Sequence, residues 1–275
     1  MRILLTGASG QVGRAFQQAA HRHSVVALRH ADLAVEDAAA CERAVAEARP
    51  DWIVHPAAMT DVDACERDPA KAHAVNAVGA GNLAAAAARR GRRMALVSTD
   101  YVFDGRSGNY REGDATGPLS HYGRSKLEGE RLVGAALPAA IVARTSVVFG
   151  PHKNNFVLWV RRSLRAGAPV KVAHDQWVTP TCADDVARQV LALVEADEEG
   201  VWHTAGAERL SRAAMAHRIA AHDGLDASPI QPVPMDSLPW LAPRPRDSSL
   251  DTSKVRRLVA PMGFDEALDT LGAAA

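Results

Sequence analysis

The alternation of apolar and helical segments in the first 145 residues is the feature that most constrains the fold. Short apolar runs have the length and composition of buried strands, and they lie at residues 2–6, 24–28, 52–55, 93–98 and 139–145. Segments of helical periodicity lie between them, at residues 11–21, 36–48, 69–90 and 119–133. Because strands that alternate with helices form βαβ units, the sequence predicts an α/β fold with a parallel sheet wound on both faces.

Three glycines follow the first predicted strand directly, in the string TGASGQVG of residues 6–13. The first glycine allows a tight turn, the second lets the backbone approach a pyrophosphate, and the third lets helix and strand pack closely. Free N–H groups at the start of the next helix then point at the phosphates. We predict a dinucleotide-binding turn, in which the cofactor contacts are Gly7, Ser9, Gly10, Gln11, Val12 and Gly13.

The end of the second predicted strand indicates which dinucleotide binds. An NAD-specific site usually has an acidic residue there for the ribose 2′-hydroxyl, whereas this chain has Arg29. A guanidinium suits a 2′-phosphate, so we predict NADPH as the cofactor, with NADH as the alternative. The competing interpretation of Arg29 is a solvated surface arginine.

The alternation becomes less regular after residue 150. Helices are predicted at residues 156–166, 182–196 and 212–222, and strands at residues 170–173 and 200–204. Residues 229–245 contain six prolines, too many for regular structure, and indicate a wrapping segment or binding loop. We predict a Rossmann-like, NADP-binding domain over residues 1–146, completed by strands within 166–205, and a smaller substrate-binding part over residues 147–275.

Tyr122 and Lys126 form a Y-x-x-x-K pair near the start of the helix predicted at residues 119–133. Residues four apart share one helix face, so the Lys126 ammonium can lie beside the Tyr122 phenol. Because a free tyrosine titrates near ~10 and a neighbouring cation favours its ionised form, we expect a lowered pKa for Tyr122. Tyr122 is then a usable acid–base group near neutral pH. A surface pair without function is the alternative.

Thr99 lies in the string STDYVFDG of residues 98–105, at the end of the fourth predicted strand. Strand ends are where ligands bind in open parallel sheets, and the Thr99 hydroxyl can donate to a substrate carbonyl. Together with the glycine turn, AAMTDVDACE at 57–66, YGRSK at 122–126 and DQWVTPT at 175–181, the string resembles the dTDP-4-dehydrorhamnose reductase family. These are extended short-chain dehydrogenases/reductases. The resemblance covers nearly the whole chain, in order.

The resemblance implies reduction of the 4-keto group of a nucleotide-linked deoxysugar. Hydride would pass from the nicotinamide to the keto carbon while Tyr122 protonates the oxygen, Lys126 holds the ribose hydroxyls and Thr99 orients the carbonyl. The further cofactor contacts that it implies are Asp32 and Leu33 near the adenine, Ala57, Ala58 and Asn76 in the cleft, and Thr145 beside the nicotinamide. The substrate contacts that it implies are Tyr101, Val147, Asn155, Phe156 and Trp177.

Two segments depart from the family pattern. Val147 stands where many members have Trp, and the family's D-Q-x-G-x-P-T is here DQWVTPT, with Trp177 inserted and Val178 in place of the glycine. The two changes either compensate for each other or mark a different sugar. They leave two alternatives open: a sugar-nucleotide epimerase of the same superfamily, and a non-catalytic NADP-binding regulatory subunit resembling the β subunit of methionine adenosyltransferase.

Composition narrows the range of partners. The 32 basic residues balance 32 acidic ones, which argues against a nucleic acid or an anionic membrane surface as the partner. No apolar run approaches the ~20 residues that span a bilayer. Three cysteines without a C-x-x-C pair indicate a reduced, cytoplasmic compartment. The histidines show no metal-ligand spacing, so no metal site is expected. A nucleotide sugar is the expected partner, and a homodimer stays open.

A run of arginines on one predicted helix has two interpretations. Arg161, Arg162 and Arg165 could meet a pyrophosphate, or they could form a solvated face. The solvated face is favoured, because arginine is mostly exposed in globular proteins.

Overall fold

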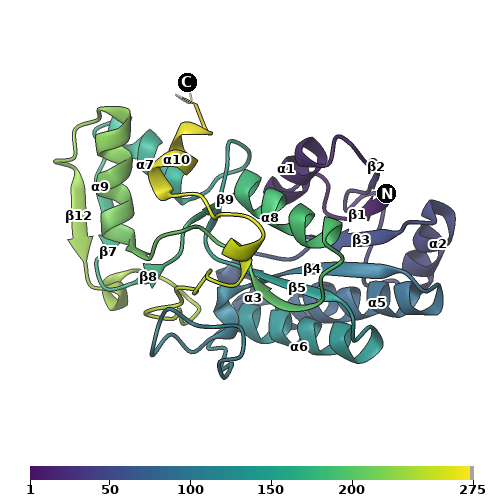
Figure 1. Ribbon diagram of the computed structural model, residues 1–275. Coiled ribbons are helices and arrows are strands. Elements are labelled where there is room, and N and C mark those ends of the chain that lie inside the picture. Colours follow the sequence, from purple (N-terminus) through teal and green to yellow (C-terminus); the bar gives the residue numbers. More distant parts are fainter. Residues whose placement is uncertain (273–275) are drawn as a thin grey trace.

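The computed structural model describes residues 1–272, and its centre is one parallel sheet (Figure 1). Its six strands follow the order β10–β5–β4–β3–β1–β2, and every neighbouring pair is parallel. The predicted doubly wound α/β fold is therefore confirmed. The strand order reverses between β1 and β3, and ligands bind outside the carboxyl ends at such a point. The strands are β1 (Arg2–Leu5), β2 (Ser24–Ala27), β3 (Trp52–His55), β4 (Arg93–Thr99), β5 (Ile141–Thr145) and β10 (Gly200–His203).

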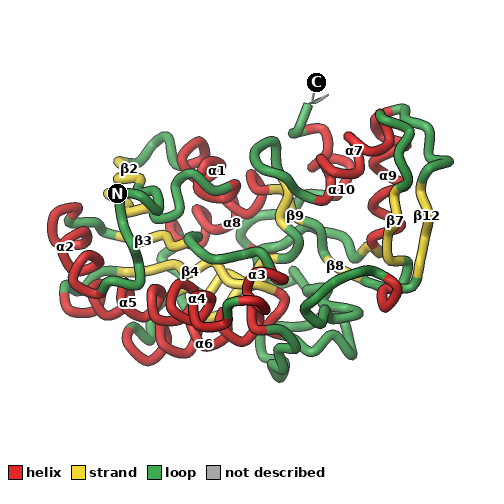
Figure 2. The backbone as a smooth tube through the Cα atoms, turned by 180° about the vertical axis from the view of Figure 1, so that it is seen from behind, coloured by secondary structure: helices red, strands yellow, loops and turns green. Residues whose placement is uncertain are grey.

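Helices cover both faces of the sheet, as βαβ connections require. Helices α1 and α8 lie side by side on one face, and α2, α5 and α6 lie on the other (Figure 1, Figure 2). The short helices α3 and α4, which pack against α6, follow β3. These helices are α1 (Gln11–Ala19), α2 (Ala38–Ala48), α3 (Val62–Arg67), α4 (Pro69–His73), α5 (Gly79–Arg89), α6 (His121–Ala136) and α8 (Ala183–Glu195).

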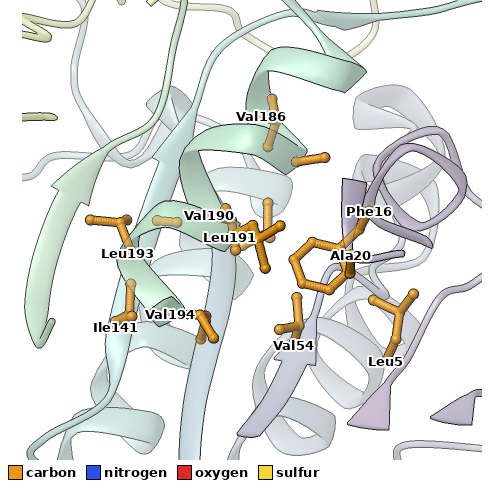
Figure 3. Packing of buried hydrophobic residues seen from close by; sticks show 14 of the residues in the cluster. Leu5, Phe16, Ala20, Val54, Ile141, Val186, Val190, Leu191, Leu193 and Val194 are labelled. Carbon is orange, nitrogen blue, oxygen red and sulfur yellow. The ribbon is translucent and has the colours of Figure 1, made fainter. Parts of the chain in front are cut away.

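The core on the α1/α8 face consists of apolar side chains that project from the helices onto the sheet. Phe16 from α1 and Val190 from α8 are both completely buried, and they point toward Val54 and Ile141 of the strands (Figure 3). Burying one such side chain is worth about 1.5–3 kcal/mol relative to leaving it exposed. This packing fixes where α1 begins relative to the strand ends, and it thereby positions the glycine turn.

The helix expected at residues 69–90 contains a change of helical winding. Helix α4 passes into a π-helical turn, Ala74–Val78, before α5 continues to Arg89. Asn76 lies in this turn, and its carbonyl oxygen is so close to α6 that a Cβ on Gly129 would lie 2.4 Å from it. π-Helical turns of this kind are frequent at functional sites.

A smaller lobe, built from β7, β12, α7, α9 and α10, lies at one end of the sheet, on the left of Figure 1. The predicted strand interval 166–205 divides between two places. Its strand β10 joins the main sheet beside β5, whereas β7 pairs with β12 outside that sheet. The elements after β5 are β6 (Val148–Phe149), α7 (Phe156–Arg165), β7 (Val170–Ala173), β8 (Trp177–Val178), β9 (Thr181–Cys182), β11 (Leu210–Ser211), α9 (Arg212–Asp223), β12 (Ile230–Val233) and α10 (Phe264–Asp269).

The proline-rich segment 229–245 is partly regular, and the expectation that it has no regular structure is wrong for its first residues. Strand β12 pairs in parallel with β7 and contains Pro232. The pairing is extended at both ends. The Val170 amide of β7 donates to the carbonyl oxygen of Pro229, just before β12, at 2.9 Å, and the His174 amide, just after β7, donates to that of Val233 at 3.1 Å. Because proline is tolerated at a sheet edge, Pro232 does not interrupt this pairing.

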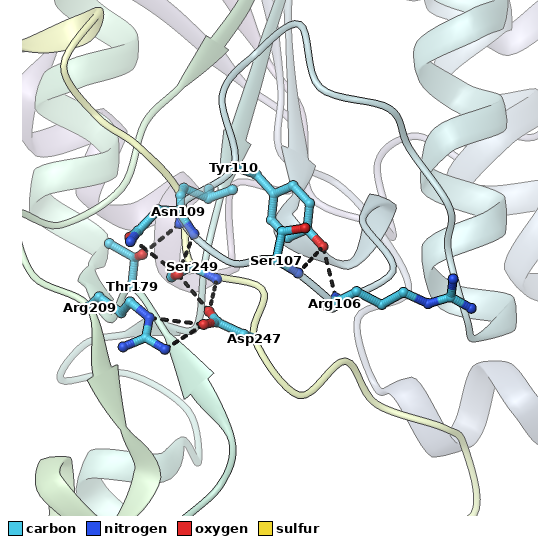
Figure 4. A network of polar contacts seen from close by, with 9 residues as sticks. Arg106, Ser107, Asn109, Tyr110, Thr179, Arg209, Asp247 and Ser249 are labelled. Atoms are coloured by element: carbon cyan, nitrogen blue, oxygen red, sulfur yellow. Dashed lines mark hydrogen bonds and ion pairs between the residues drawn. The ribbon is translucent and has the colours of Figure 1, made fainter.

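Polar contacts tie the C-terminal segment to the loop that follows β4 (Figure 4). The Ser249 hydroxyl accepts from the Asn109 amide at 2.7 Å and donates to Asp247 at 2.6 Å. Asp247 also pairs with Arg209 at 2.5 Å. The Leu250 amide donates to Thr179 at 2.8 Å. These contacts join residues 247–250 to Asn109, Thr179 and Arg209, which are far apart in sequence.

Within residues 1–272, no helix combines the length and the apolar character that crossing a bilayer requires.

Candidate active site

A cleft of about 560 Å³ opens at the carboxyl ends of β1, β3, β4 and β5. The sheet and the smaller lobe both contribute side chains to its walls. Its size lies within the usual range for ligand pockets. The predicted site residues that line it are Gly7, Ser9, Gly10, Gln11, Val12, Gly13, Arg29, Leu33, Ala57, Ala58, Thr99, Tyr101, Tyr122, Lys126, Thr145, Val147, Asn155 and Phe156.

The glycine turn has the geometry of a phosphate site. Gly7 has φ +58°, and the Gly10 amide donates to the Gly7 carbonyl oxygen at 2.9 Å. A Cβ on Gly13 would lie 2.2 Å from that same oxygen, so only glycine lets α1 start this close to β1. No side chain caps α1, and its first turn contains no acidic residue. The helix therefore presents free N–H groups and a positive dipole end to an anion.

The catalytic candidates meet where β4 and α6 approach each other. Thr99 ends β4, and the phenol of Tyr122 on α6 is near enough for the Thr99 hydroxyl to lower its pKa. Ser120 caps α6 by accepting from the Gly123 amide at 3.2 Å. A Cβ on Gly123 would lie 2.2 Å from the Tyr101 carbonyl oxygen, which shows how closely α6 approaches the turn after β4.

The pKa of Tyr122 is shifted in the direction opposite to our expectation. Burial raises the pKa above its ordinary value, and the hydroxyl of Thr99 opposes that shift. Lys126 does not lower it, because its amine points to the sheet and donates to the Val97 carbonyl oxygen at 2.7 Å. Burial also lowers the pKa of Lys126 to about 8, against the opposing charge of Glu130. At neutral pH the phenol therefore holds its proton.

A buried ion pair lies one turn along α6 from Lys126. Glu130 and Arg144 are each less than one tenth exposed, and Arg144 Nη2 lies 2.7 Å from the Glu130 carboxylate. Ser98 donates to the same carboxylate from β4. Because Tyr122, Lys126 and Glu130 are spaced four residues apart, they share one face of the helix. Glu130 thus supplies negative charge beneath the lysine.

Asp100 is a buried carboxylate that sequence reasoning did not single out as a site residue. It is 2 % exposed and accepts hydrogen bonds from Thr99 (3.1 Å), Ser146 (2.8 Å) and Ser248 (2.6 Å). Burial raises its pKa, and the three hydroxyl donors oppose the shift. Asp100 joins the turn after β4 to the C-terminal segment and so holds Thr99 in place.

The predicted 2′-phosphate contact is engaged in an ion pair. Arg29 Nε and Nη2 donate to the Asp32 carboxylate at 2.9 and 3.1 Å. The pair is solvent-exposed, with 64 % of the Arg29 side chain accessible. Asp32 is not among the residues that line the cleft, because its carboxylate turns toward Arg29, and its expected contact with the adenine stays a prediction. The pKa of Asp32 falls to about 2, mainly through this hydrogen bond.

Two more predicted residues lie behind the lining. Asn76 is buried, and its amide group holds the Met59 backbone, accepting from the nitrogen at 2.7 Å and donating to the oxygen at 3.0 Å. The Trp177 ring lies under the guanidinium of Arg209, whose carbon is 4.0 Å from the ring centre. The expectation that Asn76 lines the cleft is therefore wrong, and the expected contact of Trp177 with the substrate stays a prediction. Asn76 positions the segment that carries Ala57 and Ala58.

One further residue of the cleft, Thr145, has a polar group that a bound dinucleotide could use. The Thr145 hydroxyl oxygen is buried at the end of β5 and has no hydrogen-bond partner among residues 1–272. His55, at the end of β3, is buried and shares a 2.7 Å hydrogen bond with Thr6. Burial and the charge of Lys126 lower the pKa of His55 to about 3, so its ring is neutral. Thr145 thus offers an unused hydroxyl donor at the end of β5.

Comparisons with known proteins bear on which family has this site. A family model described as the RmlD substrate binding domain matches residues 1–273. The chain is 40% identical over 259 residues to the dTDP-4-dehydrorhamnose reductase of Mycolicibacterium smegmatis, an alignment that covers 92% of this chain and 79% of that protein. This chain belongs to the dTDP-4-dehydrorhamnose reductase family. The resemblance inferred from the sequence motifs is confirmed.

Solved structures of this reductase family agree with the fold. A dTDP-4-dehydrorhamnose reductase ortholog from Clostridium acetobutylicum superposes with a TM-score of 0.94 at 34% identity, over 98% of both chains. The dTDP-4-dehydrorhamnose reductase from Bacillus anthracis, solved in complex with NADP, gives a TM-score of 0.94 at 28% identity, over 98% of both chains.

The structure also places in the cleft a residue that the family motifs did not reveal. Arg212, the first residue of α9, lines the cleft beside Phe156. It lies 86 positions after Lys126 (212 − 126) and belongs to no motif that we recognised. The only available signal was a basic residue at the start of a predicted helix, which is common on protein surfaces.

Proposed function

We propose that the protein is an NADPH-dependent reductase of the 4-keto group of a nucleotide-linked deoxysugar, similar to dTDP-4-dehydrorhamnose reductase. The observation that carries the proposal is the convergence of Thr99, Tyr122 and Lys126 on one cleft that is continuous with the glycine turn. A dinucleotide whose phosphates lie on that turn extends along the strand ends toward these three side chains. Membership of the reductase family supports the same activity.

In the proposed reaction a carbonyl becomes an alcohol. NADPH, when bound, supplies the hydride that adds to the keto carbon, and is left as NADP⁺. Tyr122 gives its phenolic proton to the keto oxygen, and its raised pKa keeps that proton available at neutral pH. Thr99 donates a hydrogen bond to the same oxygen and fixes the carbonyl. Lys126 takes the role that the family resemblance implies: its ammonium would hold the ribose hydroxyls of the cofactor, while its contact with the Val97 carbonyl oxygen fixes the side chain in the cleft.

The cofactor preference rests on Arg29. Its exposed guanidinium can bind a 2′-phosphate through two hydrogen bonds. In the structure, the guanidinium donates to the Asp32 carboxylate instead. A 2′-phosphate would compete with the Asp32 carboxylate for the Arg29 guanidinium. The 2′-hydroxyl of NADH could instead donate a hydrogen bond to that carboxylate. We propose NADPH as the preferred cofactor. Comparison of Michaelis constants tests this: Arg29→Asp is expected to shift the NADPH-to-NADH ratio toward NADH, and an unchanged ratio contradicts the preference.

The activity is tested by NADPH consumption with a dTDP-linked 4-keto-6-deoxysugar. The wild type is expected to oxidise one NADPH per ketone, which an epimerase that recycles its cofactor or a non-catalytic subunit does not do. Tyr122→Phe removes the proton donor alone, so turnover is expected to fall about 10²- to 10⁴-fold. Its affinity for NADP⁺ should be unchanged. Retention of most of the activity would refute the role of Tyr122.

A further inference from the structure

Side-chain contacts hold Arg212 in the part of the cleft that Tyr101 and Phe156 also line. Its Nε donates to the Gln176 side-chain oxygen at 3.1 Å, and its guanidinium carbon lies 5.0 Å from the centre of the Phe156 ring. The backbone amide of Arg212 also donates to the Gln176 carbonyl oxygen at 3.1 Å. Both side-chain contacts orient the guanidinium, and neither neutralises it.

The two buried arginines among the described residues have carboxylate partners, whereas Arg212 is only partly buried. Arg144 pairs with Glu130, and Arg161 pairs with Asp223, each at 2.7 Å. For Arg161 this corrects the solvated face favoured from the sequence. Arg212 differs: within residues 1–272 no carboxylate oxygen lies within 4.0 Å of its nitrogens. Burial lowers the pKa of Arg212, and the charge of Asp100 and the Tyr101 phenol oppose that shift without forming an ion pair with the guanidinium.

The lining of the cleft is unbalanced in charge. Among the described residues, the cationic lining side chains are Arg29, Lys126, Lys153 and Arg212, and the only acidic one is Asp100. Three hydroxyl groups already occupy the Asp100 carboxylate. The excess of positive charge fits more than one anionic group, and the glycine turn with Arg29 accounts for the anionic groups of the cofactor alone.

The position of Arg212 relative to the reacting centre indicates which anion it meets. Tyr101 lies between them: its ring centre is 5.7 Å from that of Tyr122, and its phenol interacts with the Arg212 guanidinium. One aromatic ring therefore separates the proton donor from the cation. In a sugar nucleotide reduced at C4, the pyranose ring similarly separates the ketone from the phosphate on C1.

We propose that Arg212 binds the diphosphate of the sugar-nucleotide substrate, at the phosphate nearest the sugar. This inference rests on the proposed function, and it names the group that recognises the substrate as a nucleoside diphosphate rather than a free sugar. A planar guanidinium can hold a phosphate through two parallel hydrogen bonds. The contact is the same before and during hydride transfer, so it acts on KM more than on kcat.

Calorimetric titration separates this role from a structural one. Arg212→Gln, Arg212→Lys and the wild type, each saturated with NADP⁺, are titrated with dTDP and with thymidine. We expect Arg212→Gln to weaken dTDP binding about 10- to 100-fold and to leave thymidine binding within a factor of two. Arg212→Lys, which keeps the charge but not the planar fork, should recover part of the loss. Arg257→Gln removes an exposed arginine away from the cleft and should behave as the wild type does.

Each outcome decides the proposal. A normal dTDP affinity in Arg212→Gln, an equal loss for thymidine, or a wild type that binds no dTDP would overturn it. Unchanged NADP⁺ affinity in both Arg212 variants shows that they are folded. If Arg212→Gln does not fold, the comparison of dTDP with thymidine binding is made with Arg212→Lys. Loss of dTDP binding in a protein that never oxidises NADPH would support Arg212 and refute the reductase. Normal turnover with an unchanged KM in Arg212→Gln would support the reductase and refute the role of Arg212.

Discussion

The two halves of the cleft are built in different ways. The half to which we assign the cofactor (the cofactor half) consists mainly of backbone at the ends of β1, β3 and β4, with the proposed phosphate site contained in one short turn, Gly7 to Gly13. The substrate half is made of side chains from separate elements, among them Val147 after β5, Phe156 on α7 and Arg212 on α9. Local geometry fixes the first half, whereas packing of the smaller lobe against the sheet fixes the second.

This difference means that a substitution should damage one half without the other. In the cofactor half, the critical quantity is how closely backbone segments approach, and any added atom is felt. In the substrate half, single side chains provide charge or shape, and they can be exchanged while the fold stays intact. The predictions below test that separation.

The largest effect is expected from Gly13→Ala. The added Cβ would lie 2.2 Å from the Gly7 carbonyl oxygen and 2.9 Å from the Ala8 Cα, both of them backbone atoms. We expect a loss of about 3 kcal/mol in the free energy of unfolding, seen as a fall of about 10 °C in Tm. NADP⁺ affinity should fall at least about tenfold, because the start of α1 moves off the phosphate site.

Gly134→Ala is the matched control for that prediction. Gly134 also lies inside a helix, and a Cβ there would meet no atom within 4 Å. Its replacement should therefore stabilise α6, by roughly 0.5–1 kcal/mol. If Gly13→Ala kept full NADP⁺ affinity, the claim that backbone approach fixes the cofactor half would fail.

The next effect is a dependence of activity on pH. Burial lowers the pKa of Lys126 to about 8, so the ammonium form predominates below that pH and is lost above it. Because loss of this charge would weaken the proposed hold of Lys126 on the cofactor ribose, kcat/KM for NADPH should fall about tenfold per pH unit above about pH 8. Lys126→Arg keeps its charge at every pH and should lose this fall, whatever its absolute rate. The same fall in both proteins would assign the titration to another group.

A smaller effect is expected at the outer edge of the cofactor half. Asp32→Asn removes the carboxylate that now holds Arg29, so the guanidinium is released to a 2′-phosphate. Because the pair is exposed, we expect KM for NADPH to fall only about two- to fivefold, with KM for NADH rising or unchanged. In the Arg29→Gln background the same substitution should no longer favour NADPH. A gain that persists there would show that Arg29 is not the phosphate contact.

The smallest effect concerns stability at the substrate half. Val147 has φ +43°, a left-handed conformation that costs a β-branched residue about 1–2 kcal/mol. Asparagine tolerates this region better, so Val147→Asn should raise the free energy of unfolding by about 1 kcal/mol. Its neighbour Val148 lies in strand β6 and packs against the core, so Val148→Asn should lower stability. Destabilisation by both would mean that Val147 packing outweighs its strain.

The amino-acid sequence predicts the cofactor half far better than the substrate half. Strand β3 has the predicted bounds, and the glycine turn is where its spacing indicated, because a short chain segment determines both. The motif that contains Tyr122 and Lys126 also correctly predicted two side chains on one helix face. It did not predict the pKa of Tyr122, which depends on burial and on how far the Lys126 amine turns toward Val97.

What the sequence could not predict depends on side-chain direction and on contacts between distant segments. Asn76 and Trp177 lie near the cleft, but their side chains are used by the Met59 backbone and by Arg209. Arg212 reaches the cleft only because α9 packs beside α7 in the smaller lobe. A periodic pattern predicts which residues share a face of a helix or strand, but not which other element packs against that face.

The central claim is that this cleft transfers a hydride to a ketone while Tyr122 supplies the proton. Its most direct test uses NADPH deuterated at the position that is transferred, with a dTDP-linked 4-keto-6-deoxysugar as the acceptor. We predict one deuterium at C4 of the product sugar for each NADP⁺ formed, and, with Tyr122→Phe, almost no labelled product in the same time. A product that carries no deuterium, or a cofactor that is recovered in its reduced form while the sugar changes, would contradict the account.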